Sequence, residues 1–122
     1  MRASQAVEVL GALGQETRLD VFRLLIQAGP AGVPAGEIAA RRKIPLATLS
    51  FHLQHLKHAR LVRSKKQGKL VIYSANFRTI DQLIGYLLHD CCGRPRTDLK
   101  ICAQAASESK PGAKATSERA DS

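Results

Sequence analysis

Acidic side chains are missing from the middle of this chain of 122 residues. No Asp or Glu occurs between Ile38 and Ile80, although the whole chain has 10 of them against 19 Lys and Arg, for a formal net charge of +9. An acid-free basic block in one small domain points to a polyanionic partner, most often nucleic acid, with a merely soluble basic surface as the alternative. The basic side chains of this window are Arg41, Arg42, Lys43, Lys57, Arg60, Arg63, Lys65, Lys66, Lys69 and Arg78.

The chain also lacks a long apolar segment and is poor in cysteine. No apolar run approaches the roughly 20 residues of a membrane span, and the opening residues lack the apolar core of a signal peptide. We therefore expect a cytoplasmic protein with no membrane partner. The cysteines number three, an odd count, and in a reducing compartment they are more often ligands or redox groups than a structural disulfide.

Patterns typical of enzymes are missing as well. The sequence offers no paired carboxylates and no Gly-rich phosphate loop, and the adjacent pair Cys91 and Cys92 is not a Cys-x-x-Cys redox motif. We therefore predict that the chain is not an enzyme.

Apolar periodicity predicts a mainly α domain with one β-hairpin. In the second expected helix, Leu19, Phe22, Leu25 and Ile26 recur at the spacing of one buried face. Gly68 supplies the positive φ that the hairpin turn requires. We expect helices over Ser4 to Leu13, Thr17 to Ala28, Gly36 to Arg42, Ala47 to about Ala59 and Phe77 to Cys92, with strands over Leu61 to Lys66 and Lys69 to Ala75.

A short helix, a Pro-containing turn, a second helix and a basic hairpin follow one another in the order of a winged helix-turn-helix. In that fold the second helix enters the major groove of double-stranded DNA. If its leucines face the core, Phe51 lies on the open side, where it either contacts a thymine methyl or packs against the hairpin or the third helix. Candidates for contact with base edges or phosphates are Thr48, Ser50, Phe51, His52 at the flank, and Gln54.

Basic side chains on the hairpin are assigned to the DNA phosphates, although a Lys-rich hairpin also protects an edge strand from aggregation. They are Arg63, Lys65, Lys66 and Lys69.

Three histidines, His52, His55 and His58, are spaced three residues apart on the same expected helix. Each step of three rotates the side chain by about 60° around the helix, so we do not expect them to share a metal ion.

The run ATLSFHLQHLKHARLV (47 to 62), the hairpin with IYSANF (72 to 77), and the opening ALGQETRLDVFRLL (12 to 25) resemble the ArsR/SmtB family of arsenical-resistance repressors. The resemblance covers about residues 6 to 92. It implies a homodimeric winged-helix repressor that binds an operator and dissociates when a metal or metalloid is captured. The stretch Gly36 to Arg42 has no cysteine, and Asp81 lacks the histidine partner of the zinc-sensing branch. What remains resembles the subgroup with a Cys-Cys pair at the end of the last helix.

All three thiols lie within twelve residues, at Cys91, Cys92 and Cys102. Soft thiolates select thiophilic ions, and three thiols without a nearby fourth ligand suit pyramidal As(III) or Sb(III) better than tetrahedral zinc. We therefore predict a metalloid effector site here. Cys91 alternatively serves as a small buried hydrophobe, and the spacer before Cys102 leaves open whether that thiol takes part.

An apolar stripe on the last helix predicts a homodimer through the first and last helices, because so small a domain leaves the stripe exposed. The stripe comprises Ile80, Leu83, Ile84, Leu87 and Leu88.

We divide the chain into a DNA-binding and dimerisation domain (1–92), a metalloid-sensing segment (93–102) and a disordered tail (103–122). The functional hypothesis is a metalloid-responsive repressor. Its alternatives are a thiol-redox or reactive-sulfur responsive repressor and an architectural DNA-binding protein without an effector.

Overall fold

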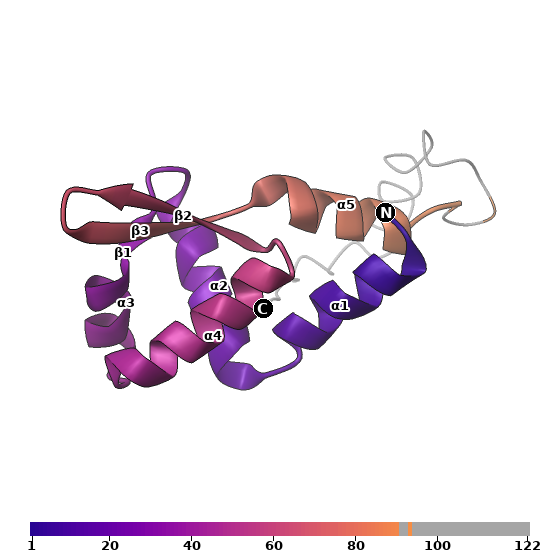
Figure 1. Ribbon diagram of the computed structural model, residues 1–122. Helices are drawn as coiled ribbons and strands as arrows, with labels where there is room; N and C mark the ends of the chain where they lie inside the picture. The colour runs from indigo at the N-terminus through magenta and orange to yellow at the C-terminus, as the bar shows by residue number, and fades with distance from the viewer. Residues whose placement is uncertain (91–92, 94–122) are drawn as a thin grey trace, which may run out of the picture. The chain divides into compact units, whose positions relative to one another are not determined.

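A computed structural model describes residues 1–90 and 93 of the chain (Figure 1). The chain divides into two compact units, Met1–Ile84 and Gly85–Ser122. The first unit holds four helices, a three-stranded sheet and most of a fifth helix. In the second unit, the described part is the last turn of that helix and the residues directly after it.

The described part of the chain forms five helices, and the start of the second shows a clear local signal. They are α1 (Ala3–Leu13), α2 (Glu16–Ala28), α3 (Ala35–Arg42), α4 (Leu46–His58) and α5 (Phe77–Leu87). The side-chain oxygen of Gln15 caps α2 by accepting a hydrogen bond of 2.8 Å from the backbone N–H of Arg18. The guanidinium of Arg18 then donates to the backbone carbonyl of Ala12 at 2.7 Å, which joins the end of α1 to the start of α2.

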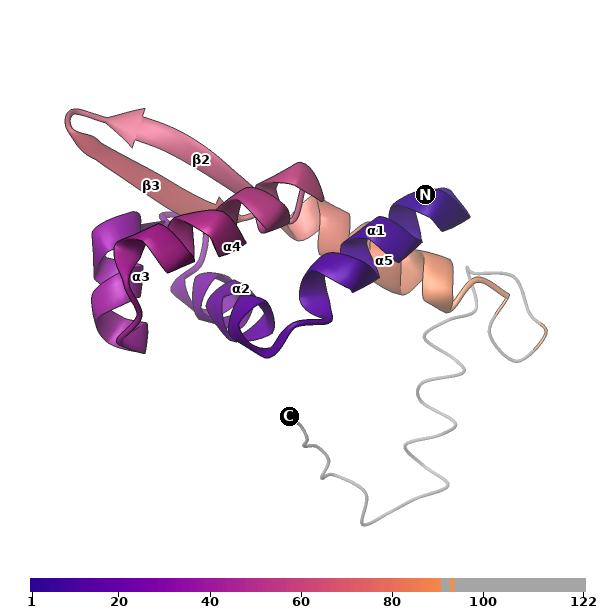
Figure 2. The same ribbon diagram turned by 60° about the horizontal axis from the view of Figure 1, so that its bottom comes forward.

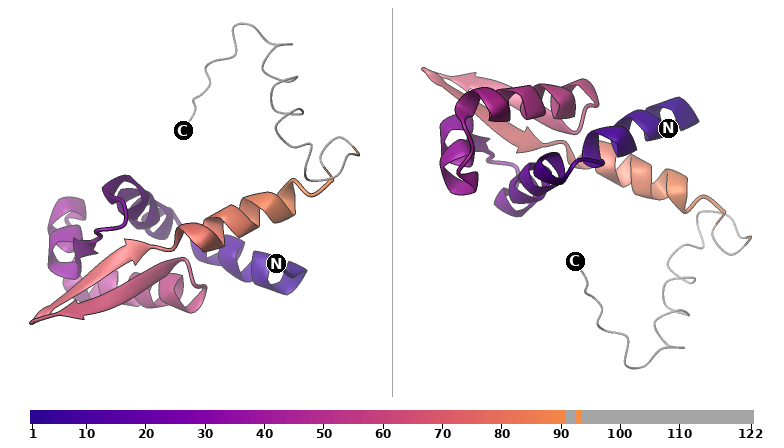
Figure 3. Two further views of the ribbon diagram at one scale, coloured as in Figure 1. Left: turned by 90° about the horizontal axis from the view of Figure 1, so that it is seen from above. Right: turned by 90° about the horizontal axis from the view of Figure 1, so that it is seen from below.

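The sheet is antiparallel, with the strand order β1-β3-β2. Strands β2 (Val62–Gln67) and β3 (Leu70–Ala75) form a hairpin that projects past α3 (Figures 2 and 3). Its two-residue turn begins at Gly68, whose φ is +62°, at the position where a type II′ turn favours glycine. The short strand β1 (Val33–Pro34), which was not among the expected strands, pairs with the other edge of β3.

Gly32 explains why β1 can lie so close to β3. Its φ is +78°, and a Cβ at this position would stand 2.6 Å from the backbone oxygen of Tyr73. A side chain is therefore excluded twice, by the backbone conformation and by the space.

The core lies where α2, α3 and α4 meet the sheet. The expected buried face of α2 needs correction. On α2 the buried side chains are Val21, Phe22, Leu24 and Leu25, and Leu19 is exposed, because α2 packs against α1, α4 and β3 together. The largest fully buried side chains are Val21, Leu25, Ile38, Leu49, Leu53, Leu56 and Leu61.

The expected helix from Phe77 to Cys92 is shorter in the structure. It ends at Leu87, and the residues from Leu88 to Asp90 form a turn in which Asp90 has a φ of +57°. Leu88 therefore does not continue the helical stripe. Within the described residues, no helix is both long enough and apolar enough to span a membrane.

Candidate nucleic-acid interface

The link between α3 and α4 is only three residues long. Lys43 ends α3 in the left-handed conformation, with a φ of +56°, and its N–H donates to the carbonyl of Ala40 at 3.4 Å. Pro45 stands directly before α4 with an extended backbone (φ −61°, ψ 144°), where its missing N–H costs nothing. This tight turn sets α3 and α4 against each other as a helix-turn-helix, and the two helices pack on one another.

The open face of α4 presents a set of side chains with mixed chemistry. Phe51 is 60% exposed. Its ring lies edge-on to that of His55, with 4.9 Å between the ring centroids. Of the two alternatives for Phe51, burial against the hairpin or the third helix is therefore not found, and the aromatic side chain stands in solvent on the helix expected to enter the groove. The exposed side chains of this face include Thr48, Ser50, Phe51, Gln54 and His55, the last of which the sequence analysis left out.

His52 corrects the expected DNA-contacting set, because its side chain is buried. It belongs to the same buried stripe as three leucines of α4. Counted from Leu49, His52 lies at i+3, Leu53 at i+4 and Leu56 at i+7. Burial lowers the pKa of His52, and the charges of Arg18 and His55 lower it further. Its Nδ1 is buried and has no hydrogen-bond partner among the described residues. His52 is therefore part of the core and does not lie on the open face of α4.

The hairpin distributes its basic side chains over both of its faces. Because side chains alternate along a strand, Ser64 and Lys66 share the face of the buried Val62, while Arg63 and Lys65 lie on the opposite, outer face. Lys69 lies in the turn. On the inner face, the ammonium of Lys57 on α4 donates to the hydroxyl of Ser64 at 2.7 Å. This bond fastens the hairpin to α4, and no sequence motif pointed to it.

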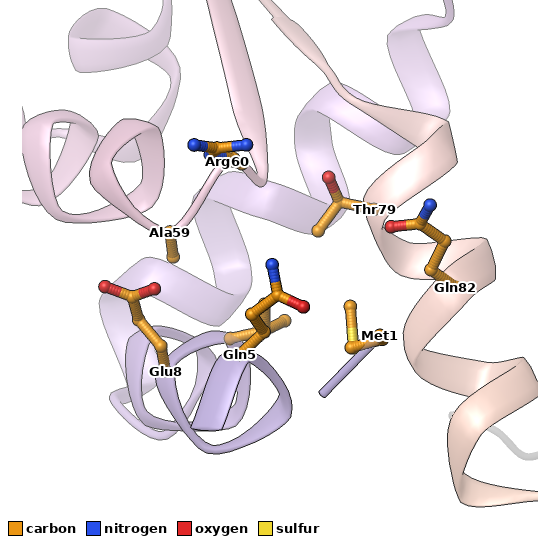
Figure 4. A pocket seen from close by; sticks show the side chains of 8 residues that line it. Met1, Gln5, Glu8, Ala59, Arg60, Thr79 and Gln82 are labelled. Atoms are coloured by element: carbon orange, nitrogen blue, oxygen red, sulfur yellow. The ribbon is translucent and has the colours of Figure 1, made fainter. Parts of the chain in front are cut away.

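Helix α4 is also connected to α1 at its far end. The imidazole Nε2 of His58 lies 3.3 Å from a carboxylate oxygen of Glu8. Beside this pair is a cavity of about 150 Å³ where α1, the end of α4 and the first half of α5 meet. Figure 4 shows the mainly polar side chains around it, which include Gln5, Glu8, Arg60, Thr79 and Gln82. The joint between these three helices is therefore not tightly packed.

The expected dimer stripe divides into buried and exposed members. Leu83 is only 3% exposed, because it points into the chain's own core, and Ile80 packs against that core. The expectation that Leu83 needs a partner chain to be buried is therefore wrong. Ile84, one position further around the helix, is 48% exposed, and on α1 Val7 is 68% exposed. Leu87 and Leu88 belong to the second unit and are also exposed.

The predicted effector site at Cys91, Cys92 and Cys102 lies outside the described residues, as does the tail at 103–122. Of the proposed sensing segment 93–102, only Gly93 is described. Among residues 1–90 and 93, no three His, Cys, Asp or Glu side chains come together as a metal site.

A helix-turn-helix followed by a basic hairpin defines a winged-helix DNA-binding protein. Comparisons with known proteins also point to helix-turn-helix transcriptional regulators. A family model for a helix-turn-helix domain matches residues 13–65. An uncharacterised HTH-type transcriptional regulator of Methanocaldococcus jannaschii is 36% identical over 69 residues, which are 57% of this chain and 75% of that protein. The transcriptional repressor SdpR of Bacillus subtilis is 30% identical over 81 residues, which are 66% of this chain and 87% of that protein.

Solved structures give the same answer. The homodimeric winged helix-turn-helix domain of a possible ArsR-family regulator from Mycobacterium bovis is 27% identical, with a TM-score of 0.59, over 70% of this chain and 77% of that one. This chain belongs to the ArsR/SmtB family of winged-helix transcriptional regulators. These three relatives are all described as regulators of transcription and none as an enzyme.

Proposed function

We propose that this chain is a metalloid-responsive transcriptional repressor without catalytic activity. It binds operator DNA as a homodimer, and it leaves the operator when As(III) or Sb(III) binds the thiols of Cys91, Cys92 and Cys102. The observation that carries the effector assignment is the position of these thiols. The first of them follows the last residue of α5 by four positions, and the chain has no other cysteine.

The homodimer is supported by the apolar side chains that α1 and α5 leave exposed. Val7 and Ile84 lie on the two helices that also contact the core through Val9 and Leu83. Burying this surface against a second copy removes apolar area from water at about 25 cal/mol per Å². The M. bovis domain that shares the fold is itself a homodimer.

A path from the thiols to the DNA-reading helix runs through α5. The three cysteine thiols would hold the metalloid and so restrain the chain after α5, whose first half meets α1 and the end of α4 around the cavity beside Glu8. Since this joint is polar and incompletely filled, the side of α5 that faces it can shift while Leu83 stays in the core. The contact between the Glu8 carboxylate and the His58 imidazole passes the shift from α1 to α4. Two copies of α4 must match half-sites about 34–36 Å apart, so a small rotation is sufficient to lose the match.

The test is a DNA-release assay with separate effectors. DNA selected from a random-sequence pool by the protein is labelled, and arsenite, peroxide or zinc is added to the complex. We expect arsenite alone to release the DNA. Release by peroxide but not by arsenite would replace the proposal with a thiol-redox repressor, and release by none of them would indicate an architectural protein.

Cysteine variants assign the site. Cys91→Ser with Cys92→Ser should bind the selected DNA as tightly as the wild type and stay bound in arsenite. Cys102→Ser shows whether the third thiol is needed: a two-thiol site keeps the response, and a three-thiol site loses most of it. Loss of DNA binding in the double variant, without arsenite, would instead give the cysteines a structural role.

A further inference from the structure

A pocket of about 230 Å³ lies at the base of the hairpin, where β3 passes into α5. Its polar walls come from Arg63, Ser74, Asn76 and Arg78, and its apolar walls include Pro30 and Phe77. Arg63 and Ser74 are cross-strand partners on the outer face of the hairpin. Asn76 comes directly after β3 ends at Ala75 and also lines the pocket. The pocket is thus separate from the open face of α4.

The charged side chains at this pocket are all positive. Two arginines line it and no acidic residue does, and within the described residues neither Arg63 nor Arg78 forms an ion pair. The first turn of α5 also contains no acidic residue. A helix N-terminus carries a partial positive charge, so an arginine in its first turn is unfavourable unless an anion lies nearby. Placing Arg78 there costs stability that a bound anion restores.

The neutral side chains are suited to the same ligand. The backbone of Asn76 is fully engaged, since its N–H donates to Leu61 at 2.8 Å and its carbonyl accepts from Thr79 at 3.1 Å. Its side-chain Oδ1 is buried and has no hydrogen-bond partner among the described residues, so the amide is uncommitted and can turn its NH₂ toward a ligand. The Ser74 hydroxyl adds another donor.

We propose that this pocket binds a phosphate group, with Arg63 and Arg78 as its two guanidinium ligands and Ser74 and Asn76 as hydrogen-bond donors. Arginine is the side chain whose planar fork matches phosphate oxygens. The volume accommodates one phosphate and attached carbon atoms, for which Pro30 and Phe77 supply apolar contact. The phosphate comes either from the DNA backbone or from a small phosphate-bearing molecule. In both cases the site connects the hairpin to α5.

The experiment has one arm for each source. In the first arm, binding of a mixed-sequence 30-base-pair duplex is measured against salt concentration for the wild type, Arg63→Gln and Arg78→Gln. If the phosphate belongs to DNA, each variant lowers the slope of log affinity against log salt by about 0.9. Arg23→Gln is the matched control, because Arg23 is an exposed arginine on α2 that does not line the pocket. It should keep the wild-type slope.

In the second arm, inorganic phosphate is titrated into the DNA-free protein, with chloride at equal ionic strength as the control. A small-molecule site gives saturable shifts in the amide resonances from Ser74 to Arg78, and Arg78→Gln abolishes them. Far-UV circular dichroism verifies that each variant is folded. Wild-type salt slopes together with no saturable phosphate shift would overturn the proposal. Neither arm involves arsenite, so the result is independent of the proposed effector.

Discussion

Helices α4 and α5 use their apolar side chains in different ways. On α4 every leucine of the central stripe is buried within the chain, and even His52 has been drawn into that stripe. On α5, Leu83 is buried while Ile84, its direct neighbour, stands in solvent. The surface that α4 leaves open is mostly polar, and the surface that α5 leaves open is apolar. The apolar stripe of α4 is therefore covered by the chain itself, whereas α5 leaves apolar surface exposed that the proposed homodimer would bury.

The largest expected difference between α4 and α5 is measured by truncating one side chain on each helix. Leu53→Ala removes a fully buried side chain of α4, and we expect it to lower the free energy of unfolding by about 2–5 kcal/mol. Ile84→Ala should cost less than about 1 kcal/mol when the protein is dilute enough to be monomeric. Urea unfolding followed by circular dichroism at several protein concentrations measures both. Equal losses for the two variants would contradict the division between the helices.

The next largest effect concerns association. Ile84→Glu should raise the dimer dissociation constant at least about 100-fold, because a twofold axis places each new charge in the interface twice. Sedimentation equilibrium measures the constant. Leu70→Glu is the control, since Leu70 is an exposed leucine of the hairpin. It should leave the dimer intact. A dimer of Ile84→Glu as tight as the wild type would remove this part of α5 from the interface.

The difference between the two helices also explains what could be predicted from the sequence. Local signals were sufficient for α3, α4 and the hairpin, since Pro45, Gly68 and the leucine spacing act within a few residues. Tertiary contacts decided the rest. The strand β1 has only two residues and exists because β3 passes beside Gly32. His52 and Leu83 are buried because neighbouring elements cover them. The apolar spacing within one helix does not show how many of its side chains the neighbouring elements will bury.

A smaller effect is expected at the open face of α4. Phe51→Ala should weaken binding to the selected DNA about tenfold, the cost of about one poorly matched base pair, and should leave binding to random DNA unchanged. The reason is that an apolar side chain reads base edges, whereas phosphates are bound by basic groups. Fluorescence anisotropy with both DNAs measures the ratio, and Phe51→Leu should retain part of the preference. An equal loss on both DNAs would assign Phe51 to general positioning.

The smallest effect tests whether His52 belongs to the core of α4. Its pKa is held below the ordinary value of 6.5, mainly by burial. As the pH falls below about 6.5 the unfolded chain takes up a proton at this position and the folded chain resists it, so the free energy of unfolding decreases. Above that pH His52 is neutral in both states and makes no difference.

His52→Gln removes this titration, so its stability should decline less steeply than that of the wild type between pH 7.5 and pH 5.5. Urea unfolding at each pH measures both curves, and their difference isolates His52, because every other titrating group is common to the two proteins. Parallel curves would mean that His52 takes up its proton as readily in the folded chain as in the unfolded one. The imidazole would then lie on the solvent side of α4, where it would again be available to DNA.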